Sequence, residues 1–470
     1  MRHISCRAAE RLSIFSVIFI FICLGSVAQK ISAVENYAIN RPGVVMIKTV
    51  FSANVYINRM KMDNRKFISL LDSIQSLDKN GVVFTAEQKL DIVLHEMNNN
   101  PSRFFKATLD YLKQGEEITS TGTGFFITGD GYVATNCHLI DLENSFIRRQ
   151  FILSAFQQIT EENIAALQNS WATTFTDQQR SLLNNTYASV YSRLFSMVLN
   201  DLKKEVFVVY RGDGPNKESI NEKKSALIVV KGEPMPGKDI AILKIDGDSS
   251  LPTLRIADEQ LPQVGEQLYV YGYPAPVTNN DFVSAESALE PTLTTGIVSA
   301  IKKSVYGWPV IQMDANINHG SSGGPVCNEK GEVIGLTTFG SIENRGGLAA
   351  GLNFAIPVSI LNEYLDTADI RPSSSKASRF FDEAVHLFEQ EYYQKALIRF
   401  QEVGRLSNHY PGVRSYIEQC RRNILNGEDK ESVLFRYDLL GFSLLLLLVL
   451  ILYVLLKRKR DRNGLKHKIT

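Results

Sequence analysis

The chain has little net charge. Its 470 residues include 51 basic and 50 acidic side chains, which gives a formal net charge of +1 at pH 7. A balance this close to neutrality supplies no general field that would attract nucleic acid or acidic substrates, so we expect no nucleic-acid partner. The length suits two or three folded units, because a single hydrophobic core rarely grows beyond about 250–300 residues.

Cysteine is also scarce. Of the five cysteines, Cys6 and Cys23 lie in an apolar N-terminal segment, and Cys137, Cys327 and Cys420 are scattered through the rest of the chain. An odd set with such wide spacing excludes a disulfide framework. A Cys137–Cys327 bridge remains an alternative, but the sequence favours free, buried thiols.

The longest apolar runs lie near the two ends of the chain. The first, residues 12–24, follows a basic start and precedes the small residues Gly25, Ser26 and Ala28. A basic head, an apolar middle and a small-residue exit predict a secretory signal peptide at residues 1–28. An uncleaved N-terminal anchor is the alternative.

The second run consists almost entirely of Leu, Val and Ile and predicts a transmembrane helix at residues 437–456, since about 20 apolar residues cross a hydrocarbon core. Four basic residues follow at positions 457–460, and such clusters stay on the cytoplasmic side. We therefore expect a cytoplasmic tail at residues 457–470 and a body outside the cytoplasm, periplasmic if the source is bacterial. A buried globular helix is the alternative interpretation.

Short β-branched runs bounded by glycine and proline predict a β-rich domain at residues 41–366. An Asp-Gly pair between two of these runs, at residues 129–131, favours a hairpin turn. Strands are expected at residues 44–50, 124–128, 132–135, 206–210, 226–230, 240–245, 267–271, 296–300 and 333–336. Apolar residues at helical spacing interrupt this domain and predict helical insertions at about 51–118 and 141–205.

A linker is expected at residues 367–376, where serine and proline are frequent. Beyond it, Ala384, Ala396, Phe400 and Val403 have the spacing of a tetratricopeptide-type helical pair, and a further helix follows within residues 377–426. Such repeats normally need three or more units for stability. An ordinary amphipathic hairpin packed on the β-domain therefore remains the alternative.

Three short segments carry candidate catalytic chemistry. His138 ends a predicted strand, Asp239 directly precedes one, and Ser322 lies in a glycine-rich turn. Each segment alone is weak evidence, because a lone histidine is often structural and an aspartate before a strand is often a cap. Together, in the order His, Asp, Ser on a β-domain, they predict the catalytic triad of a chymotrypsin-type serine protease.

The chemistry explains why these residue types are needed. A serine hydroxyl is a poor nucleophile until an imidazole removes its proton, and a buried carboxylate holds that imidazole in the correct tautomer. The tetrahedral oxyanion then needs converging backbone donors, which we expect to be the N–H groups of Gly320 and Ser322. Glycines around the serine permit the tight turn that this arrangement requires.

These segments resemble the protease domain of the Deg/HtrA branch of trypsin-like serine proteases. The resemblance extends to Gly265, Gly272, Gly296 and other positions between the acid and the serine, and covers residues 41–364 apart from the two insertions. It implies two six-stranded β-barrels with the triad between them, protein or peptide substrates and no metal or organic cofactor. It also implies a homo-oligomer, a trimer in this family.

The chain departs from the family pattern in several places. A peptide-binding PDZ domain usually follows the protease domain, whereas here the helical segment and the apolar run take its place. His319 stands where the family prefers proline, and Ser321 where it prefers asparagine. The first insertion occupies the position of a regulatory loop. The second is interpreted either as a lid or oligomer contact, or as a passive elaboration of the surface.

Substrate preference is predicted only in part. The resemblance assigns the floor of the substrate pocket to Asn316, with Phe339 and Gly340 also lining it. Without a carboxylate at the floor, cleavage after lysine or arginine is disfavoured. The family resemblance implies small aliphatic or apolar side chains instead. The leading hypothesis is thus a membrane-anchored serine endopeptidase acting on extracytoplasmic, including misfolded, proteins. The alternatives are a catalytically idle peptide-binding scaffold and a signalling module that recruits partners through the helical repeat.

Overall fold

The computed structural model describes residues 30–79, 81, 83–141, 144–194, 197–213, 219–246, 250–258, 260–274, 284, 287–342, 348–408, 410–430, 441 and 443–457. The chain divides into two compact units. The first, called the β-unit below, consists of Met1–Ile47, Gly122–His138 and Val208–Thr470. The second, called the insertion unit, consists of Lys48–Thr121 and Leu139–Phe207.

One sheet of the β-unit closes into a barrel. Its strands follow the order β12-β9-β10-β11-β14-β13, and β12 pairs with both β9 and β13, so six strands form a ring. A short seventh strand, β8 (Arg255–Ile256), adds to β13 in parallel. The six strands of the ring are β9 (Gln267–Gly272), β10 (Thr292–Lys303), β11 (Pro309–Met313), β12 (Pro325–Cys327), β13 (Glu332–Ile342) and β14 (Leu348–Pro357). The predicted six-stranded β-barrel is thus confirmed for this sheet.

The other sheet has seven strands in the order β5-β4-β1-β2-β3-β7-β6. Its two outermost strands, β5 (Ser219–Ser225) and β6 (Leu227–Lys231), are separated in the chain by Ala226 alone. The two ends of the sheet are therefore joined through one residue, and β5 and β6 correspond to one interrupted strand of the expected barrel. The other bounds are β1 (Val44–Met62), β2 (Phe105–Phe126), β3 (Tyr132–Thr135), β4 (Met197–Asp213) and β7 (Ala241–Lys244).

The hairpin that leads to the candidate histidine forms as the sequence predicts. β2 and β3 pair antiparallel, with Phe125 opposite Ala134. The turn between them contains Gly131 at φ +107°, where a Cβ atom would lie 2.6 Å from the carbonyl oxygen of Ile245. Glycine is needed here because an L side chain rarely adopts this conformation and would also clash with the neighbouring strand end.

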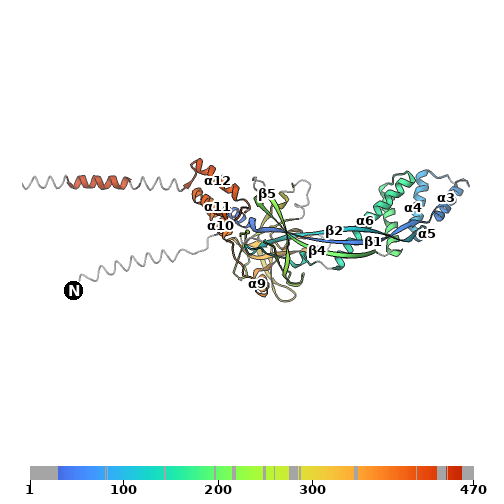
Figure 1. The fold of residues 1–470 in the computed structure, drawn as a ribbon, viewed down its shortest axis with the longest axis horizontal. Helices are drawn as coiled ribbons and strands as arrows, with labels where there is room; N and C mark the ends of the chain where they lie inside the picture. Colours follow the sequence, from blue (N-terminus) through green and yellow to red (C-terminus); the bar gives the residue numbers. More distant parts are fainter. Residues whose placement is uncertain are drawn as a thin grey trace, which may run out of the picture. The chain divides into compact units, whose positions relative to one another are not determined.

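The insertion unit contains the helices α3 (Asn64–Lys79), α4 (Ala86–Asn99), α5 (Pro101–Phe104), α6 (Asn144–Trp171) and α7 (Asp177–Leu194), shown in Figure 1. Parts of β1, β2 and β4 also belong to it, so the insertions are less helical than predicted. The unit has its own apolar core, in which Phe104, Met97 and Phe151 are completely buried.

Two of the helical predictions are wrong. Leu109 and Leu112, whose spacing contributed to the predicted helical insertion at about 51–118, lie on strand β2. Val198 and Leu202, whose spacing contributed to the one at about 141–205, lie on strand β4. Residues three apart point to opposite faces of a strand, which matches Leu109 being 93% exposed while Leu112 packs on the core. Residues four apart share one face of a strand as well as of a helix, so this spacing alone did not distinguish the two structures.

The C-terminal helices of the β-unit pack together with helix α2 (Ala33–Asn40), near the start of the described chain. The three that follow the predicted linker are α10 (Lys376–Glu389), α11 (Tyr393–Leu406) and α12 (Val413–Leu425) (Figure 1). Their shared core includes all four residues of the tetratricopeptide-like spacing, Ala384, Ala396, Phe400 and Val403. The helices are as expected, and the identity of the repeat stays a prediction.

This helical segment is also tied to the β-sheet part of the unit by hydrogen bonds. The backbone N–H of Thr253 donates to Oγ of Ser378 at 2.8 Å, and the backbone N–H of Ser375 donates to Oγ1 of Thr253 at 3.0 Å. Because Ser375 and Ser378 are buried, these bonds are shielded from water and hold the start of α10 in place. The predicted linker is therefore a docked segment.

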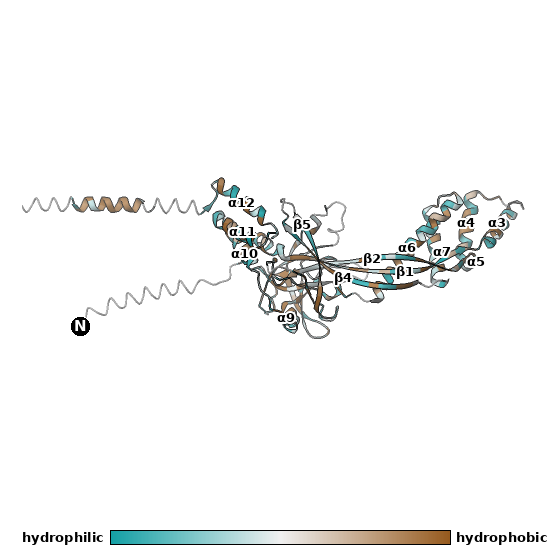
Figure 2. Cartoon of the chain, viewed as in Figure 1, coloured by the Kyte–Doolittle hydropathy of each residue, from teal (hydrophilic) through white to brown (hydrophobic). Residues whose placement is uncertain are grey.

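The predicted signal peptide lies wholly outside the described residues, and the predicted transmembrane helix and cytoplasmic tail lie partly outside them. The residues outside are all of the signal peptide at residues 1–28, residues 437–440 and 442 of the predicted transmembrane helix, and residues 458–470 of the tail. Within the described part of the chain, no helix combines the length and the apolarity needed to cross a membrane. Residues 443–457 are helical, and Figure 2 colours them as hydrophobic almost throughout.

Candidate active site

The structure brings His138 and Asp239 into direct contact. The ring Nδ1 of His138 lies 2.6 Å from Oδ2 of Asp239, and the backbone N–H of His138 donates to Oδ1 at 2.8 Å. The Asp239 side chain is completely buried, whereas that of His138 is 34% exposed. A buried carboxylate paired in this way fixes the orientation of the imidazole and leaves Nε2 as its second functional nitrogen.

The backbone around Asp239 is held in a tight turn just before β7. The N–H of Ile240 donates to the carbonyl oxygen of Lys238 at 2.8 Å, which closes a three-residue turn with Asp239 at its centre. The carbonyl oxygen of Asp239 accepts a hydrogen bond from Nδ2 of the buried Asn136 at 2.7 Å. The turn and this amide together set the direction of the carboxylate.

Thr338, on β13, contacts both the acid and the serine. Its Oγ1 donates to Oδ2 of Asp239 at 2.9 Å, and its carbonyl oxygen lies 3.0 Å from Oγ of Ser322. Among the hydrogen bonds of the described residues, none joins Ser322 to His138. Rotation about the Cα–Cβ bond of Ser322 moves its hydroxyl between staggered positions, so the contact with Thr338 marks one of them.

The segment before Ser322 forms a turn that requires glycine. The backbone N–H of Ser321 donates to the carbonyl oxygen of Asn318 at 2.9 Å, and Gly320 has φ +94°. Of the two central residues of this turn, only Gly320 has a positive φ, which is the pattern of a type II turn. His319 therefore occupies the first central position.

The backbone donors of this turn are available for a ligand. The N–H groups of Gly320 and Ser322 make no hydrogen bond within the described part of the chain. The carbonyl oxygen of Gly320 is meanwhile held by Oγ1 of the buried Thr123 at 2.7 Å. These two unpaired N–H groups are the ones expected to bind an oxyanion.

The glycines after Ser322 are needed for close packing. A Cβ atom on Gly323, which has φ +81°, would lie 2.2 Å from the carbonyl oxygen of Thr123. A Cβ atom on Gly324 would lie 2.0 Å from the carbonyl oxygen of Tyr271. Contacts this short exclude any side chain, so the turn can approach the neighbouring strands only with glycine at both positions.

The structure describes the residues assigned to the substrate pocket only in part. The side chain of Asn316 is exposed, and its carbonyl oxygen accepts a hydrogen bond from Oγ1 of Thr294 at 3.0 Å. Phe339 and Gly340 lie on β13, where their backbones pair with Phe354 and Asn353. The side-chain environment of Phe339 lies outside the described part of the structure.

Sequence reasoning did not find Thr338, Asn136 or Thr123. Thr338 lies on a strand far from Asp239 in the chain, and only the folded barrel brings its hydroxyl to the carboxylate. The only feature of the sequence that could have indicated a role for Asn136 is its position two residues before His138. A hydroxyl or amide without a charged neighbour in sequence has no pattern that separates it from other polar residues.

The cysteine prediction is confirmed. Cys137, Cys327 and Cys420 are free and buried. Burial raises the pKa of the Cys420 thiol to about 12 and that of Cys327 higher still, so both remain uncharged near neutral pH. No cluster of three or more histidine, cysteine or acidic side chains suited to a metal occurs among the residues that the structure describes.

Comparisons with known proteins agree with this geometry. Residues 122–336 match the family model described as the trypsin-like peptidase domain. A protein of Halomonas elongata named "Probable periplasmic serine endoprotease DegP-like" is 38% identical over 145 residues, which are 30% of this chain and 27% of that protein. A protein of Pseudomonas putida with the same name is 35% identical over 147 residues, 31% of this chain and 27% of the relative.

The chain thus spans little more than a quarter of the length of these curated relatives. Among solved structures, the serine endoprotease from Yersinia pestis is 19% identical, with a TM-score of 0.33 and coverage of 72% of this chain and 66% of the other. The "HtrA-type protease AlgW with decapeptide" is 18% identical, with a TM-score of 0.35 and coverage of 72% and 68%. At TM-scores this low, the two structures carry no argument about this chain.

The family match at residues 122–336 contains the paired His138 and Asp239, the turn with Ser322 and strands β9 to β12 of the barrel. Residues 122–336 are therefore a trypsin-like serine peptidase domain.

Proposed function

We propose that the chain is a serine endopeptidase in which Ser322 is the nucleophile, His138 the general base and Asp239 the residue that orients the base. The observation that carries this proposal is the contact of 2.6 Å between Nδ1 of His138 and the buried Asp239 carboxylate. With Nδ1 engaged, Nε2 is the nitrogen that can exchange a proton with Ser322.

In the proposed reaction, the Ser322 hydroxyl first turns from the Thr338 carbonyl oxygen toward His138. Its Oγ then attacks the carbonyl carbon of the scissile peptide bond while Nε2 of His138 takes the hydroxyl proton. The negative charge that develops on the carbonyl oxygen is stabilised by the N–H groups of Gly320 and Ser322, which have no partner within the described chain.

The second half of the reaction reverses the proton flow. His138 gives its proton to the leaving amine, the C–N bond breaks, and an acyl group remains on Ser322 as an ester. A water molecule then gives a proton to His138 and attacks the ester carbon. Collapse of the second tetrahedral intermediate breaks the bond between the carbonyl carbon and Oγ of Ser322 while His138 returns its proton to Oγ, which releases the carboxylic acid and restores the hydroxyl.

The proposed substrates are proteins outside the cytoplasm, including misfolded ones. This rests on the predicted signal peptide at residues 1–28 and on the predicted anchor at residues 437–456, with the tail at 457–470 in the cytoplasm. The relatives from Halomonas elongata and Pseudomonas putida are named as probable periplasmic serine endoproteases. A homo-oligomer, a trimer by resemblance, and a tetratricopeptide-like role for residues 377–426 in binding partners complete the proposal.

The proposed preference, by resemblance to the family, is for small aliphatic or apolar side chains before the cleaved bond. Asn316 provides no negative charge where a lysine or arginine side chain would end, so these residues gain no ion pair. Digestion of a peptide library by the full-length protein tests this preference. Dominant cleavage after lysine or arginine contradicts it.

Labelling with a fluorophosphonate probe tests the function itself, because such probes react only with an activated serine. We expect the full-length wild-type protein to be labelled, and the Ser322→Ala variant, which removes only the hydroxyl, to remain unlabelled. The His138→Gln variant should lose most of the labelling rate. A folded wild-type protein that takes up no probe favours the alternative hypothesis, a peptide-binding scaffold or signalling module without catalysis.

A further inference from the structure

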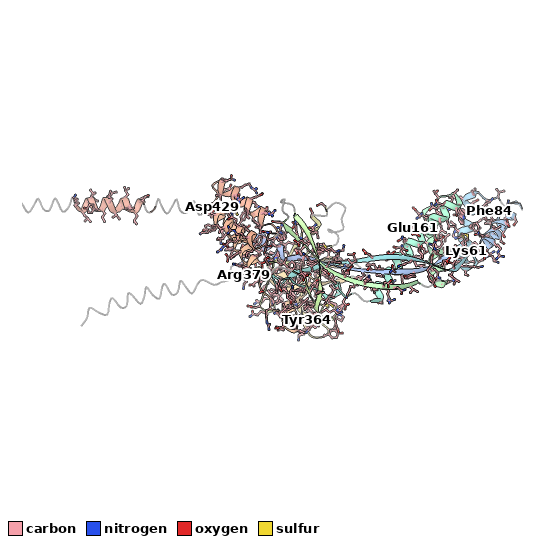
Figure 3. All side chains as sticks on the ribbon, in the orientation of Figure 1. Lys61, Phe84, Glu161, Tyr364, Arg379 and Asp429 are labelled. Atoms are coloured by element: carbon pink, nitrogen blue, oxygen red, sulfur yellow. The ribbon has the colours of Figure 1, made fainter. Side chains whose placement is uncertain are left out.

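A tyrosine on the helix after the β-barrel contacts the turn around Asp239. Helix α9 (Val358–Thr367) directly follows β14, and Tyr364, labelled in Figure 3, is half-buried on it. Its Oη donates to the carbonyl oxygen of Lys238 at 3.4 Å. This is the same oxygen that accepts the N–H of Ile240 and closes the turn centred on Asp239. Tyr364 therefore contacts the atom on which the shape of the turn depends.

Gly232 packs against the same contact. A Cβ atom at this position would lie 2.4 Å from Oη of Tyr364 and 2.1 Å from the carbonyl oxygen of Lys238. Any side chain here would push the tyrosine and the turn apart. The glycine is thus needed for the tyrosine to reach the turn, which indicates that the contact is built into the fold.

The backbone of Gly232 also connects this contact to both candidate catalytic segments. Its N–H donates to the carbonyl oxygen of Ile240, next to Asp239, at 2.8 Å. Its carbonyl oxygen accepts a hydrogen bond from Sγ of Cys137, next to His138, at 3.1 Å. A shift of the Tyr364 side chain would therefore displace the backbone next to Asp239 and the backbone next to His138.

The tyrosine is suited to this role because it stays a donor. Burial is the main cause that raises the pKa of Tyr364 above its usual value, so its hydroxyl keeps its proton at neutral pH. Helix α9 makes a second contact with Lys238, an ion pair between Glu363 and the Lys238 side chain. This pair lies at the surface, and exposed ion pairs contribute little to stability. The hydroxyl is therefore the more important of the two contacts.

We propose that Tyr364 is a positioning residue for the reaction. It holds the Lys238 carbonyl group, which fixes the turn that directs the Asp239 carboxylate toward His138. The inference rests on the proposed function, because it assigns Tyr364 an effect on the residue that orients the base. Tyr364 itself contacts neither substrate nor the reacting atoms.

The Tyr364→Phe variant of the full-length protein removes only the hydroxyl group. We expect kcat to fall about three- to tenfold, the range that corresponds to the loss of one hydrogen bond, with KM unchanged. The acidic limb of the pH profile should move to lower pH, because a less well directed carboxylate stabilises the imidazolium less. The matched control is Asp366→Asn on the same helix, an exposed residue paired with Arg371, which should behave as wild type.

Gly232→Ala provides a second variant that leaves the hydroxyl in place but displaces it. We expect a loss of kcat at least as large as that of Tyr364→Phe. Combining both substitutions should lower kcat no further than Gly232→Ala alone, because the contact is already broken. Additive losses contradict the assignment of both residues to one contact.

A measurement without turnover separates this inference from the proposed function. In Ser322→Ala protein with isotope-labelled histidine, the ring signal of His138 is followed by NMR as pH changes, with and without Tyr364→Phe. A midpoint that moves to lower pH supports positioning even if the wild type neither cleaves nor takes up probe. An unchanged midpoint, together with unchanged kcat in an active enzyme, overturns it.

Discussion

The Asp239 carboxylate accepts two hydrogen bonds from His138, one from the ring and one from the backbone N–H of the same residue. The backbone bond fixes where the carboxylate lies relative to the chain at His138, and the ring bond then fixes the imidazole relative to the carboxylate. A third donor, the Thr338 hydroxyl, contacts the same oxygen as the ring. The carboxylate is thus fully buried but well supplied with donors, as a buried charge requires.

Replacement of Asp239 by asparagine tests the role of this carboxylate. The amide has nearly the same shape, but its NH₂ group cannot accept a hydrogen bond from the imidazole and favours the wrong tautomer. We expect kcat to fall by about 10⁴-fold, as at comparable triads. Steady-state kinetics with a peptide substrate measure this loss, and circular dichroism checks that the variant is folded. Near-normal activity in folded Asp239→Asn protein argues against the triad.

Thr338→Val removes the third donor at almost constant volume. Because a hydrogen bond to a charged group contributes about 1.5–3 kcal/mol, we expect roughly a 10- to 100-fold loss of kcat. Thr338→Ser keeps the hydroxyl and is the control, with most of the activity retained. Equal losses in the valine and serine variants indicate that packing of the threonine methyl group, and not its hydroxyl, matters at this position.

Two substitutions in the turn before Ser322 should have opposite effects. Gly320→Ala places a Cβ atom at φ +94° and disturbs the donors of the oxyanion site, where the loss of one donor costs about 2.7–4 kcal/mol. The rate of probe labelling should fall about 100-fold or more. Labelling of Gly320→Ala at the wild-type rate excludes this N–H group as an oxyanion donor.

His319→Pro should instead be tolerated. His319 occupies the first central position of a type II turn, where proline has the required φ, and its N–H makes no hydrogen bond within the described chain. We expect unchanged labelling and a gain in stability of about 0.4–1 kcal/mol from the stiffer unfolded chain. Thermal unfolding followed by fluorescence measures it, and a clear loss of stability shows that the turn has another geometry.

Asp382 on α10 makes the stability of the helical segment depend on pH. Burial raises the pKa of its carboxyl group to about 7, against an attraction from Arg255 at 3.7 Å. Between about pH 4 and pH 7 the folded protein holds a proton on Asp382 that the unfolded chain has lost. The contribution of this group to stability therefore falls as pH rises toward 7 and changes little above it.

Asp382→Asn removes the charge of this half-buried carboxyl group and should separate this effect from others. At pH 5 only part of this loss of stability has accumulated, so the variant should exceed the wild type in stability by less than at pH 8. At pH 8 the variant should be more stable by about 1 kcal/mol or more, since one pKa unit corresponds to about 1.4 kcal/mol and the lost attraction of Arg255 offsets part of the gain. A stability difference that is the same at pH 5 and pH 8 contradicts the raised pKa.

Much of the fold was predictable from local patterns. The hairpin before His138 followed from strand-like runs around an Asp-Gly turn, and the strand at residues 267–271 and the helices at Ala384 and Phe400 followed from equally local signals. The strands at Leu109 and Val198 were missed because spacings of three and four residues suit a helix and leave the strand interpretation open. Their assignment depends on which neighbours they pair with.

By itself, the sequence determined which residues are suited to the chemistry: a histidine, an aspartate and a serine in a known order, with glycines where the backbone needs positive φ. Only the tertiary structure decided their support, namely Thr338 between Asp239 and Ser322, Asn136 behind the acid, and Tyr364 on the turn. The physical reason is that reactive groups reveal themselves by residue type. A supporting hydroxyl or amide gains its role from a distance of about 3 Å across the fold, which no local pattern contains.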